Sequence, residues 1–226
     1  MIPENNLEQR KSTNSVLIYE EENKKMKILV TLFLLISTMV NAAGYNIEPE
    51  NLVQEIHEIN NVIFDYKDID KWDILINGTI SAETLYGQYS GNGNLSLAQI
   101  SKAGFGFIQS RLTDADKEKL SALGYENDVK FTELKKDNRL AIIYCALYYK
   151  YKLQEVPPQS LEECAKVWKK YYNTIEGKGR PKDFIVKFKK YGLKYVMNFY
   201  TEKNVDTSEL ISLHKAFNML VYNYVS

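Results

Sequence analysis

Residues 132–153 read TELKKDNRLAIIYCALYYKYKL, and they predict the buried helix on which the fold depends. Apolar residues recur there at helical spacing, and most of their neighbours are apolar too. This pattern is typical of a helix that is surrounded by protein. The stripe consists of Leu134, Leu140, Ile143, Tyr144, Leu147 and Tyr151. We expect Thr132 to cap this helix and the helix to occupy the centre of the fold.

The segments on either side predict further helices, and none shows a sustained alternation typical of strands. Asn77-Gly78 should interrupt the chain between two of them. The fold class expected is therefore mostly α, with a possible small β-hairpin near residues 86–96. The expected helices cover residues 48–64, 68–76, 81–89, 96–109, 113–124, 160–172, 181–192 and 207–225.

The first 42 residues have the pattern of an export signal. Residues 26–28 form a short basic start, Leu29–Val40 is an apolar run, and short residues follow at 40–42. This order is typical of a secretory signal peptide, and the run is short for a bilayer span of about 20 residues. We expect residues 1–25 to be a mis-called extension, 26–42 to be the signal peptide, and 43–226 to form one domain that is periplasmic or secreted. An uncleaved N-terminal anchor is the alternative.

The charge of the chain disfavours one class of partner. Lys and Arg together number 29, as do Asp and Glu, and removal of residues 1–42 leaves the chain neutral. A nucleic-acid-binding protein usually carries a basic excess, so we expect no nucleic-acid partner. Residues 166–194 nevertheless hold ten basic residues against two acids, Glu176 and Asp183. This segment could face an anionic polymer or a membrane surface, or be a solvated helix face.

The two cysteines leave two interpretations open. An exported chain meets an oxidising compartment, where Cys145 and Cys164 could form a disulfide between consecutive helices. Two buried thiols are the alternative, because Cys145 lies in the strongly apolar segment. Neither cysteine has the neighbours that a metal site requires, and the chain contains no phosphate-binding loop. We therefore expect neither a metal nor a cofactor.

The stretch Ile80–Gln109, ISAETLYGQYSGNGNLSLAQISKAGFGFIQ, carries the candidate chemistry. It begins with an acid, Glu83, and ends in a Gly-rich turn. Cleavage of a glycosidic bond requires a proton at the leaving oxygen, and a Glu supplies one near neutral pH only if desolvation raises its pKa. Ile80, Leu85 and Tyr86 could provide the apolar surroundings. The alternative is an ordinary solvated Glu.

Three short patterns follow one another along the chain: Glu83-Thr84, then Gly106-Phe107-Ile108-Gln109, then Tyr171-Tyr172-Asn173. With a long apolar helix between the second and the third, the chain resembles the lytic transglycosylase and goose-type lysozyme family over about residues 80–173. Thr84 stands where that family usually has Ser, and Tyr171 where it usually has Ala. The expected break at Asn77-Gly78 is a third departure, because the family leads into its acid with an unbroken helix.

The resemblance implies a lysozyme-like helical domain that cleaves peptidoglycan glycan strands between N-acetylmuramic acid and N-acetylglucosamine. It implies Glu83 as the single general acid and base, with Gln109 ordering the cleft, Tyr172 donating near the reacting sugar and Asn173 holding a helix start or the N-acetyl group. Thr84 and Gly106 complete the substrate-binding set.

Several alternatives remain open. We expect a monomer without a stable membrane span after signal cleavage. Hydrolysis and anhydro-product formation are both compatible with the resemblance. A non-catalytic cell-envelope binding or structural protein is the alternative to an enzyme.

Overall fold

A computed structural model describes residues 45–90, 96–126 and 128–203. These residues belong to one compact unit, Gly44–Ser226. The predicted extension at 1–25, the predicted signal peptide at 26–42 and the predicted last helix from 207 lie outside the described residues. None of the helices in the described ranges is long and apolar enough to cross a membrane.

The described chain is mostly helical and contains no strand, so the predicted fold class is confirmed at that level. The expected hairpin falls partly on residues 91–95, which are outside the described ranges, and residues 86–90 form no strand. The helices are α2 (Pro49–Ile63), α3 (Ile69–Thr84), α4 (Lys102–Gln109), α5 (Asp114–Ala122), α6 (Asn138–Leu153), α7 (Leu161–Val167), α8 (Pro181–Tyr191) and α9 (Leu193–Glu202), with a 3-10 turn η2 (Glu133–Lys135) and a π-helix η3 (Trp168–Asn173).

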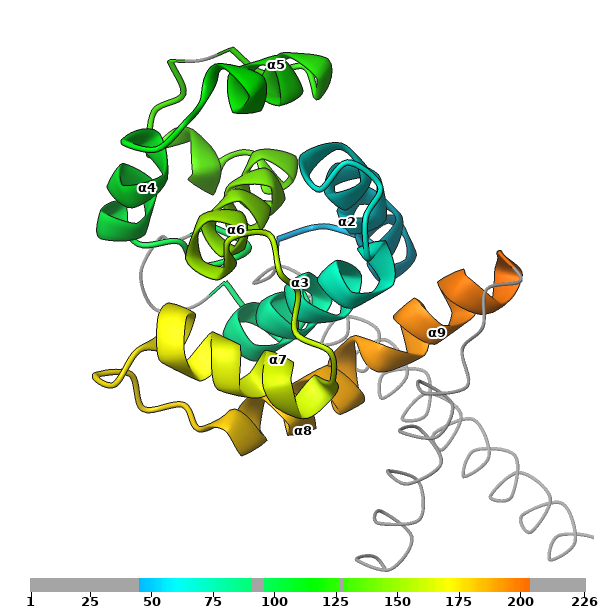
Figure 1. Cartoon of the computed structure of the whole chain (residues 1–226). Helices are drawn as coiled ribbons and strands as arrows, with labels where there is room; N and C mark the ends of the chain where they lie inside the picture. Colours follow the sequence, from blue (N-terminus) through cyan, green and yellow to red (C-terminus); the bar gives the residue numbers. More distant parts are fainter. Residues whose placement is uncertain (1–44, 91–95, 127, 204–226) are drawn as a thin grey trace, which may run out of the picture. The chain divides into compact units, whose positions relative to one another are not determined.

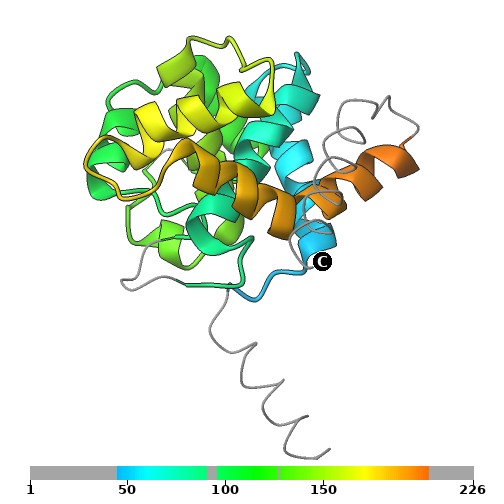
Figure 2. The ribbon, with the colours of Figure 1, turned by 90° about the horizontal axis from the view of Figure 1, so that it is seen from below.

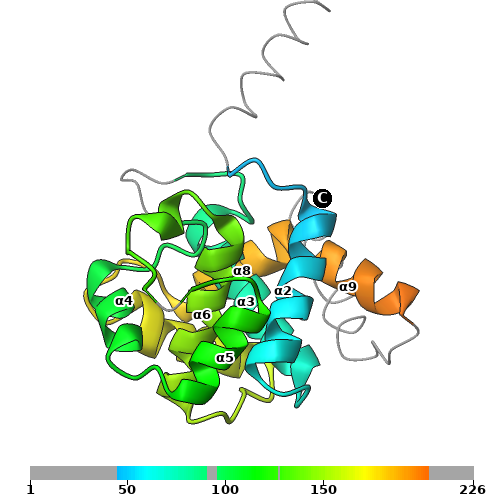
Figure 3. The same cartoon turned by 90° about the horizontal axis from the view of Figure 1, so that it is seen from above.

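Helix α3 packs against α2, α6, α7, α8 and α9, and every residue from 75 to 82 is buried (Figures 1 and 3). The predicted break at Asn77-Gly78 is wrong, because α3 runs unbroken through both residues, and no new helix begins at Ser81. The reason is the tertiary packing of α3 against α8. A Cβ at position 78 would overlap the ring of Phe184 in α8, so the glycine allows two helices to approach closely.

Helix α6 is buried, as predicted, but it shares the centre of the fold with α3 and begins later than expected. Its cap is Asp137, whose carboxylate accepts a hydrogen bond from the backbone N–H of Leu140 at 3.0 Å. Thr132 instead precedes the separate turn η2. The predicted cap at Thr132 is therefore wrong, because a better-placed carboxylate follows it.

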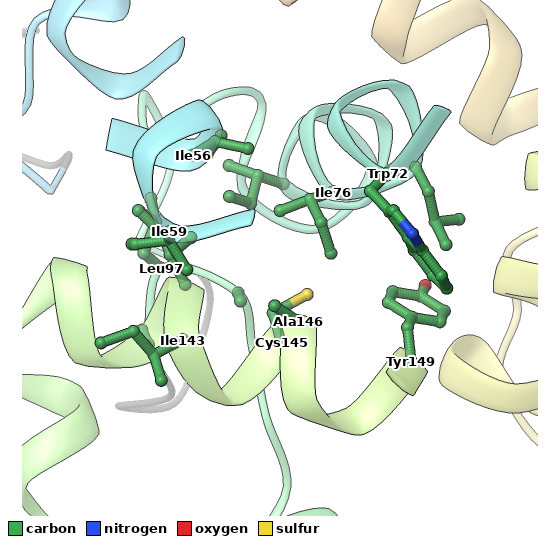
Figure 4. Close-up of a cluster of buried hydrophobic side chains, with 14 of the residues drawn as sticks. Ile56, Ile59, Trp72, Ile76, Leu97, Ile143, Cys145, Ala146 and Tyr149 are labelled. Carbon is green, nitrogen blue, oxygen red and sulfur yellow. The ribbon is translucent and has the colours of Figure 1, made fainter. Parts of the chain in front are cut away.

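The core joins α2, α3 and α6 (Figure 4). Ile56, Ile76 and Ile143 are fully buried, one on each helix. Trp72 of α3 is buried and stacks on Phe64 with ring centroids 3.8 Å apart.

The structure contains no disulfide between Cys145 and Cys164, and both thiols are buried. Of the two interpretations that the sequence left open, the disulfide is therefore wrong for this structure. Burial raises the pKa of the Cys145 thiol to about 12, which makes it a poor nucleophile.

Local sequence signals mark the ends of several predicted helices. Pro49 begins α2, Pro181 begins α8, and α8 ends before Gly192. The hydroxyls of Thr113 and Ser160 accept hydrogen bonds from the third backbone N–H of α5 and α7, respectively. Residues 96–109 differ from the prediction, because 96–101 are not helical and Ser101 is the cap of α4. The predicted Gly-rich turn at 104–109 is also wrong, because Gly104 and Gly106 lie inside that helix.

The close contact between α3 and α8 gives a stability prediction. Gly78→Ala should lower the free energy of unfolding by about 1–3 kcal/mol, since the added methyl group forces Phe184 or α8 to move. Gly106→Ala is the matched control, because nothing lies within 4 Å of a Cβ at that helical position. It should raise stability by about 0.5–1 kcal/mol. Urea unfolding of both variants measures the difference, and equal stability changes would contradict the close packing of α3 on α8.

Candidate functional site

Glu83 lies in the last turn of α3 and is partly buried. Its Oε1 atom accepts a hydrogen bond from the indole Nε1 of Trp168 at 2.8 Å. Trp168 is the first residue of η3 and is itself buried. The predicted acid is therefore held against the segment that carries Tyr172 and Asn173.

The surroundings of Glu83 favour its protonated form. Burial raises the pKa of this carboxyl, and the Trp168 hydrogen bond and the charge of Lys187 partly oppose that shift. Lys187 is a residue of α8, and its Nζ donates to the backbone carbonyl of Ala82 beside the acid. A carboxyl in these surroundings can hold a proton at a higher pH than a solvated Glu, as a general acid must.

A cavity of about 280 Å³ lies where α4, α6 and η3 meet. Three aromatic rings form part of its lining, and Tyr148 packs edge-on against both others, with centroid distances of 5.6 Å to Phe107 and 5.4 Å to Tyr172. Lys152 also lines the cavity, with its Nζ 3.8 Å from the centre of the Phe107 ring. Aromatic faces with a cation beside them suit a sugar or another amphipathic ligand that carries an acidic group.

Tyr172 connects this cavity with Glu83. Its ring lines the cavity, and its hydroxyl donates to the carbonyl of Ala98 at 2.5 Å. Burial raises the pKa of Tyr172 well above its usual value, and the charge of Glu83 raises it further. Glu83 is not one of the cavity-lining residues, and the geometric link between Glu83 and Tyr172 is η3, whose Trp168 binds Glu83 and whose Tyr172 lines the cavity.

Gln109 and Thr84 make contacts within the protein. The amide Nε2 of Gln109 donates to the hydroxyl of Tyr144 in α6 at 2.7 Å, which fixes the end of α4. Thr84 is fully buried, and its hydroxyl lies 3.0 Å from the carbonyl oxygens of both Ile80 and Leu97. Thr84 thus ties the segment that leads into the cavity to the helix that carries Glu83.

The remaining two predicted residues, Gly106 and Asn173, do not line the cavity. Gly106 is in α4, with open space where a Cβ would stand. Asn173 ends η3, and its Oδ1 accepts a hydrogen bond from Lys169 Nζ at 2.9 Å. The same ammonium donates to the carbonyls of Thr174 and Gly177, both at 2.7 Å. Asn173 and Lys169 together shape the loop that follows η3.

Trp168, Tyr148 and Lys152 were not predicted as site residues. Trp168 precedes Tyr172 by four residues on the same predicted helix, and a buried indole needs an acceptor for its N–H. That need was the one available signal, but it does not identify Glu83 as the acceptor. No feature of the sequence distinguishes Tyr148 and Lys152 from their neighbours in the apolar stretch, so neither could be identified as a site residue.

A second polar cluster joins α2, α3 and α9. Asp73 is fully buried, and its Oδ2 lies 2.7 Å from Nδ1 of His57 and 2.5 Å from the hydroxyl of Tyr200. Asn60 donates to the other carboxylate oxygen at 2.7 Å. His57 keeps 17% of its side chain exposed, so it lies at the edge of this cluster. Across the described ranges, no group of three or more His, Cys, Asp or Glu residues could hold a metal ion.

Comparisons of the chain with family models, with curated proteins and with solved structures give no match.

Trp168 and Lys187 oppose the rise in the pKa of Glu83, and this gives an electrostatic prediction. Trp168→Phe removes a hydrogen bond to the ionised carboxylate, and Lys187→Met removes a nearby positive charge, so each should raise the pKa of Glu83 further. Lys190→Met, which removes a cation from the same helix as Lys187, is the control and should leave this pKa unchanged. Titration of the Glu83 side-chain carboxyl by NMR measures all three, and a fall in the pKa of Glu83 in either of the first two variants would contradict the assignment.

Proposed function

We propose that this chain is an exported peptidoglycan-cleaving enzyme in which Glu83 is the general acid and base. The bond cut would be the one between N-acetylmuramic acid and N-acetylglucosamine in the glycan strand. The observation that carries the proposal is a carboxyl with a raised pKa that is hydrogen-bonded to Trp168 of η3, the element whose Tyr172 lines a cavity with an aromatic surface.

The chemistry requires only one carboxyl from the protein. Glu83 in its protonated form would deliver its proton to the leaving glycosidic oxygen and then, as a carboxylate, accept one from the attacking hydroxyl. In the described residues, the groups that shift its pKa are Trp168 and Lys187, and no second carboxylate is among them. A single acid fits the scheme that the family resemblance implies, in which the N-acetyl group or the 6-hydroxyl of the substrate replaces an enzyme nucleophile.

The continuous helix α3 adds support. The sequence suggested a break before the acid, which would have been a departure from the family pattern. Instead an unbroken buried helix leads into Glu83, and a second core helix, α6, lies between the Gly-x-x-Gln segment and Tyr172-Asn173. Order along the chain and helical context therefore agree with the resemblance.

A non-catalytic cell-envelope binding protein is the second candidate. The observation in its favour is that Glu83 accepts a hydrogen bond from the Trp168 indole and does not line the cavity. The amide of Gln109 likewise donates to the hydroxyl of Tyr144. A binding protein would keep the aromatic cavity for a glycan and use Glu83 only to hold α3 against η3.

Digestion of purified peptidoglycan by residues 43–226 separates the two candidates. Glu83→Gln should reduce cleavage by about 10²-fold or more, because the amide cannot donate the proton that the leaving oxygen requires. Glu118→Gln is the matched control, since Glu118 is an exposed acid of α5, and it should cleave as the unchanged protein does. Mass spectrometry of the released muropeptides measures both.

The products identify the reaction. Anhydro-muropeptides would indicate a transglycosylase, and reducing-end products would indicate a lysozyme. Equal activity of the unchanged protein and Glu83→Gln would remove Glu83 from the mechanism. Absence of products from all three folded proteins would favour the binding protein.

A further inference from the structure

The charge of this neutral chain is unevenly distributed between its elements. Residues 166–194, which form the end of α7, all of η3 and α8, and the start of α9, hold ten basic residues and two acids. Residues 45–165 hold nineteen acids and twelve basic residues. The positive charge is therefore concentrated on one group of helices, and we call their exposed lysines and arginine the basic face.

Three cations in this segment have partners. Lys169 holds the loop after η3, Lys187 donates to the carbonyl of Ala82, and Arg180 pairs with Asp183 at 3.1 Å. The other seven make no ion pair with any described residue, and six of them are exposed. They are Lys166, Lys170, Lys178, Lys182, Lys189, Lys190 and Lys194. Their charge is thus available to an external partner.

Helix α8 shows how the face is arranged. Lys182, Val186 and Lys190 recur every four residues, so they lie on one side of the helix. Phe184 and Phe188 are fully buried and occupy the other side. Helices α7 and α8 pack against each other, and Figure 2 shows them next to each other on the side facing the viewer.

Apolar and aromatic side chains accompany the lysines. Ile175, in the loop between η3 and α8, is 94% exposed, and Val186 within the α8 stripe is 45% exposed. Three lysines also lie over the ring of the following tyrosine: Lys170 over Tyr171 at 4.7 Å, Lys190 over Tyr191 at 5.0 Å, and Lys194 over Tyr195 at 4.4 Å.

This combination distinguishes between anionic partners. Lysines alone could bind any polyanion. A hydrated polymer, however, has no apolar surface to contact an isoleucine that is almost fully exposed. The headgroup region of a bilayer takes all three kinds of side chain, since phosphates attract lysines, tyrosine rings lie at the interface, and an aliphatic side chain can enter the acyl boundary.

We propose that the basic face docks on the surface of a bilayer that contains anionic lipids. The lysines would contact lipid phosphates, and Ile175 would enter the interface. The proposal concerns peripheral attachment and does not depend on the reaction proposed for Glu83.

Vesicle partitioning of the full chain tests this proposal. The vesicles are phosphatidylcholine alone or phosphatidylcholine mixed with phosphatidylglycerol. The face variant carries Lys178→Gln, Lys182→Gln and Lys190→Gln, all at exposed positions. The control variant carries Lys130→Gln, Lys135→Gln and Lys136→Gln, which remove three exposed charges elsewhere. The apolar run Leu29–Val40 is common to all proteins, and the comparison between the two vesicle types cancels any attraction it has to neutral lipid.

The expected result is preferential partitioning into the anionic vesicles that falls about tenfold or more in the face variant and is lost at high salt. The control variant should partition nearly as well as the unchanged chain. Ile175→Ser, which keeps every charge, should weaken partitioning several-fold. Circular dichroism checks that each variant is folded.

Three results would overturn the proposal. The unchanged chain could partition equally into both vesicle types, the face and control variants could lose partitioning equally, or the chain could ignore vesicles while binding a soluble polyanion such as heparin. The first would assign attachment to the apolar run, the second to overall charge, and the third to a polymer partner.

Discussion

The fold depends on a helix that is both buried on all sides and rich in polar side chains. Every buried polar group needs a hydrogen-bond partner, and one left unsatisfied costs about 1–3 kcal/mol. In α3 the side chains of Asn77, Thr79 and Ser81 each donate to a backbone carbonyl one turn earlier in the same helix, and two of the buried polar side chains also have partners on other helices. Asp73 binds His57 of α2 and Tyr200 of α9, and the hydroxyl of Thr79 lies 2.8 Å from that of Tyr149 in α6. Sliding or rotating α3 by one residue would break all of these bonds between helices together, so they fix its register more strictly than apolar packing alone would.

The register of α3 determines the position of the candidate acid, Glu83. Glu83 lies about one turn after Thr79 in α3, and its carboxylate accepts a hydrogen bond from the indole of Trp168. Burial then raises its pKa, while Trp168 and Lys187 limit the rise. The environment of Glu83 is thus a consequence of how α3 is held. Tyr86 shows the same dependence, because its hydroxyl donates to Asn77 at 2.6 Å.

The structural features that were predicted correctly depend on residues close to each other along the chain. The features that were predicted wrongly depend on contacts with distant residues. The predicted helices near 113 and 160 begin where Thr113 and Ser160 cap them, because a cap needs only a backbone N–H three residues away. Gly78 was interpreted as a break, since a glycine weakens an isolated helix. Its actual role is to make room for Phe184, more than 100 residues later, and no local pattern contains that information. The site follows the same rule: the order of motifs predicted that Glu83 and Tyr172 belong together, but not that Trp168 joins them.

The π-helix η3 connects the features that bear on function. Within six residues it supplies Trp168 to the acid, Lys170 to the basic face and Tyr172 to the cavity. A π-helix is less stable than an α-helix, and such segments persist where side-chain direction matters. If the chain docks as proposed, Lys170 would contact the bilayer from the same short element whose Trp168 holds Glu83. The two proposals therefore involve different side chains of one six-residue segment.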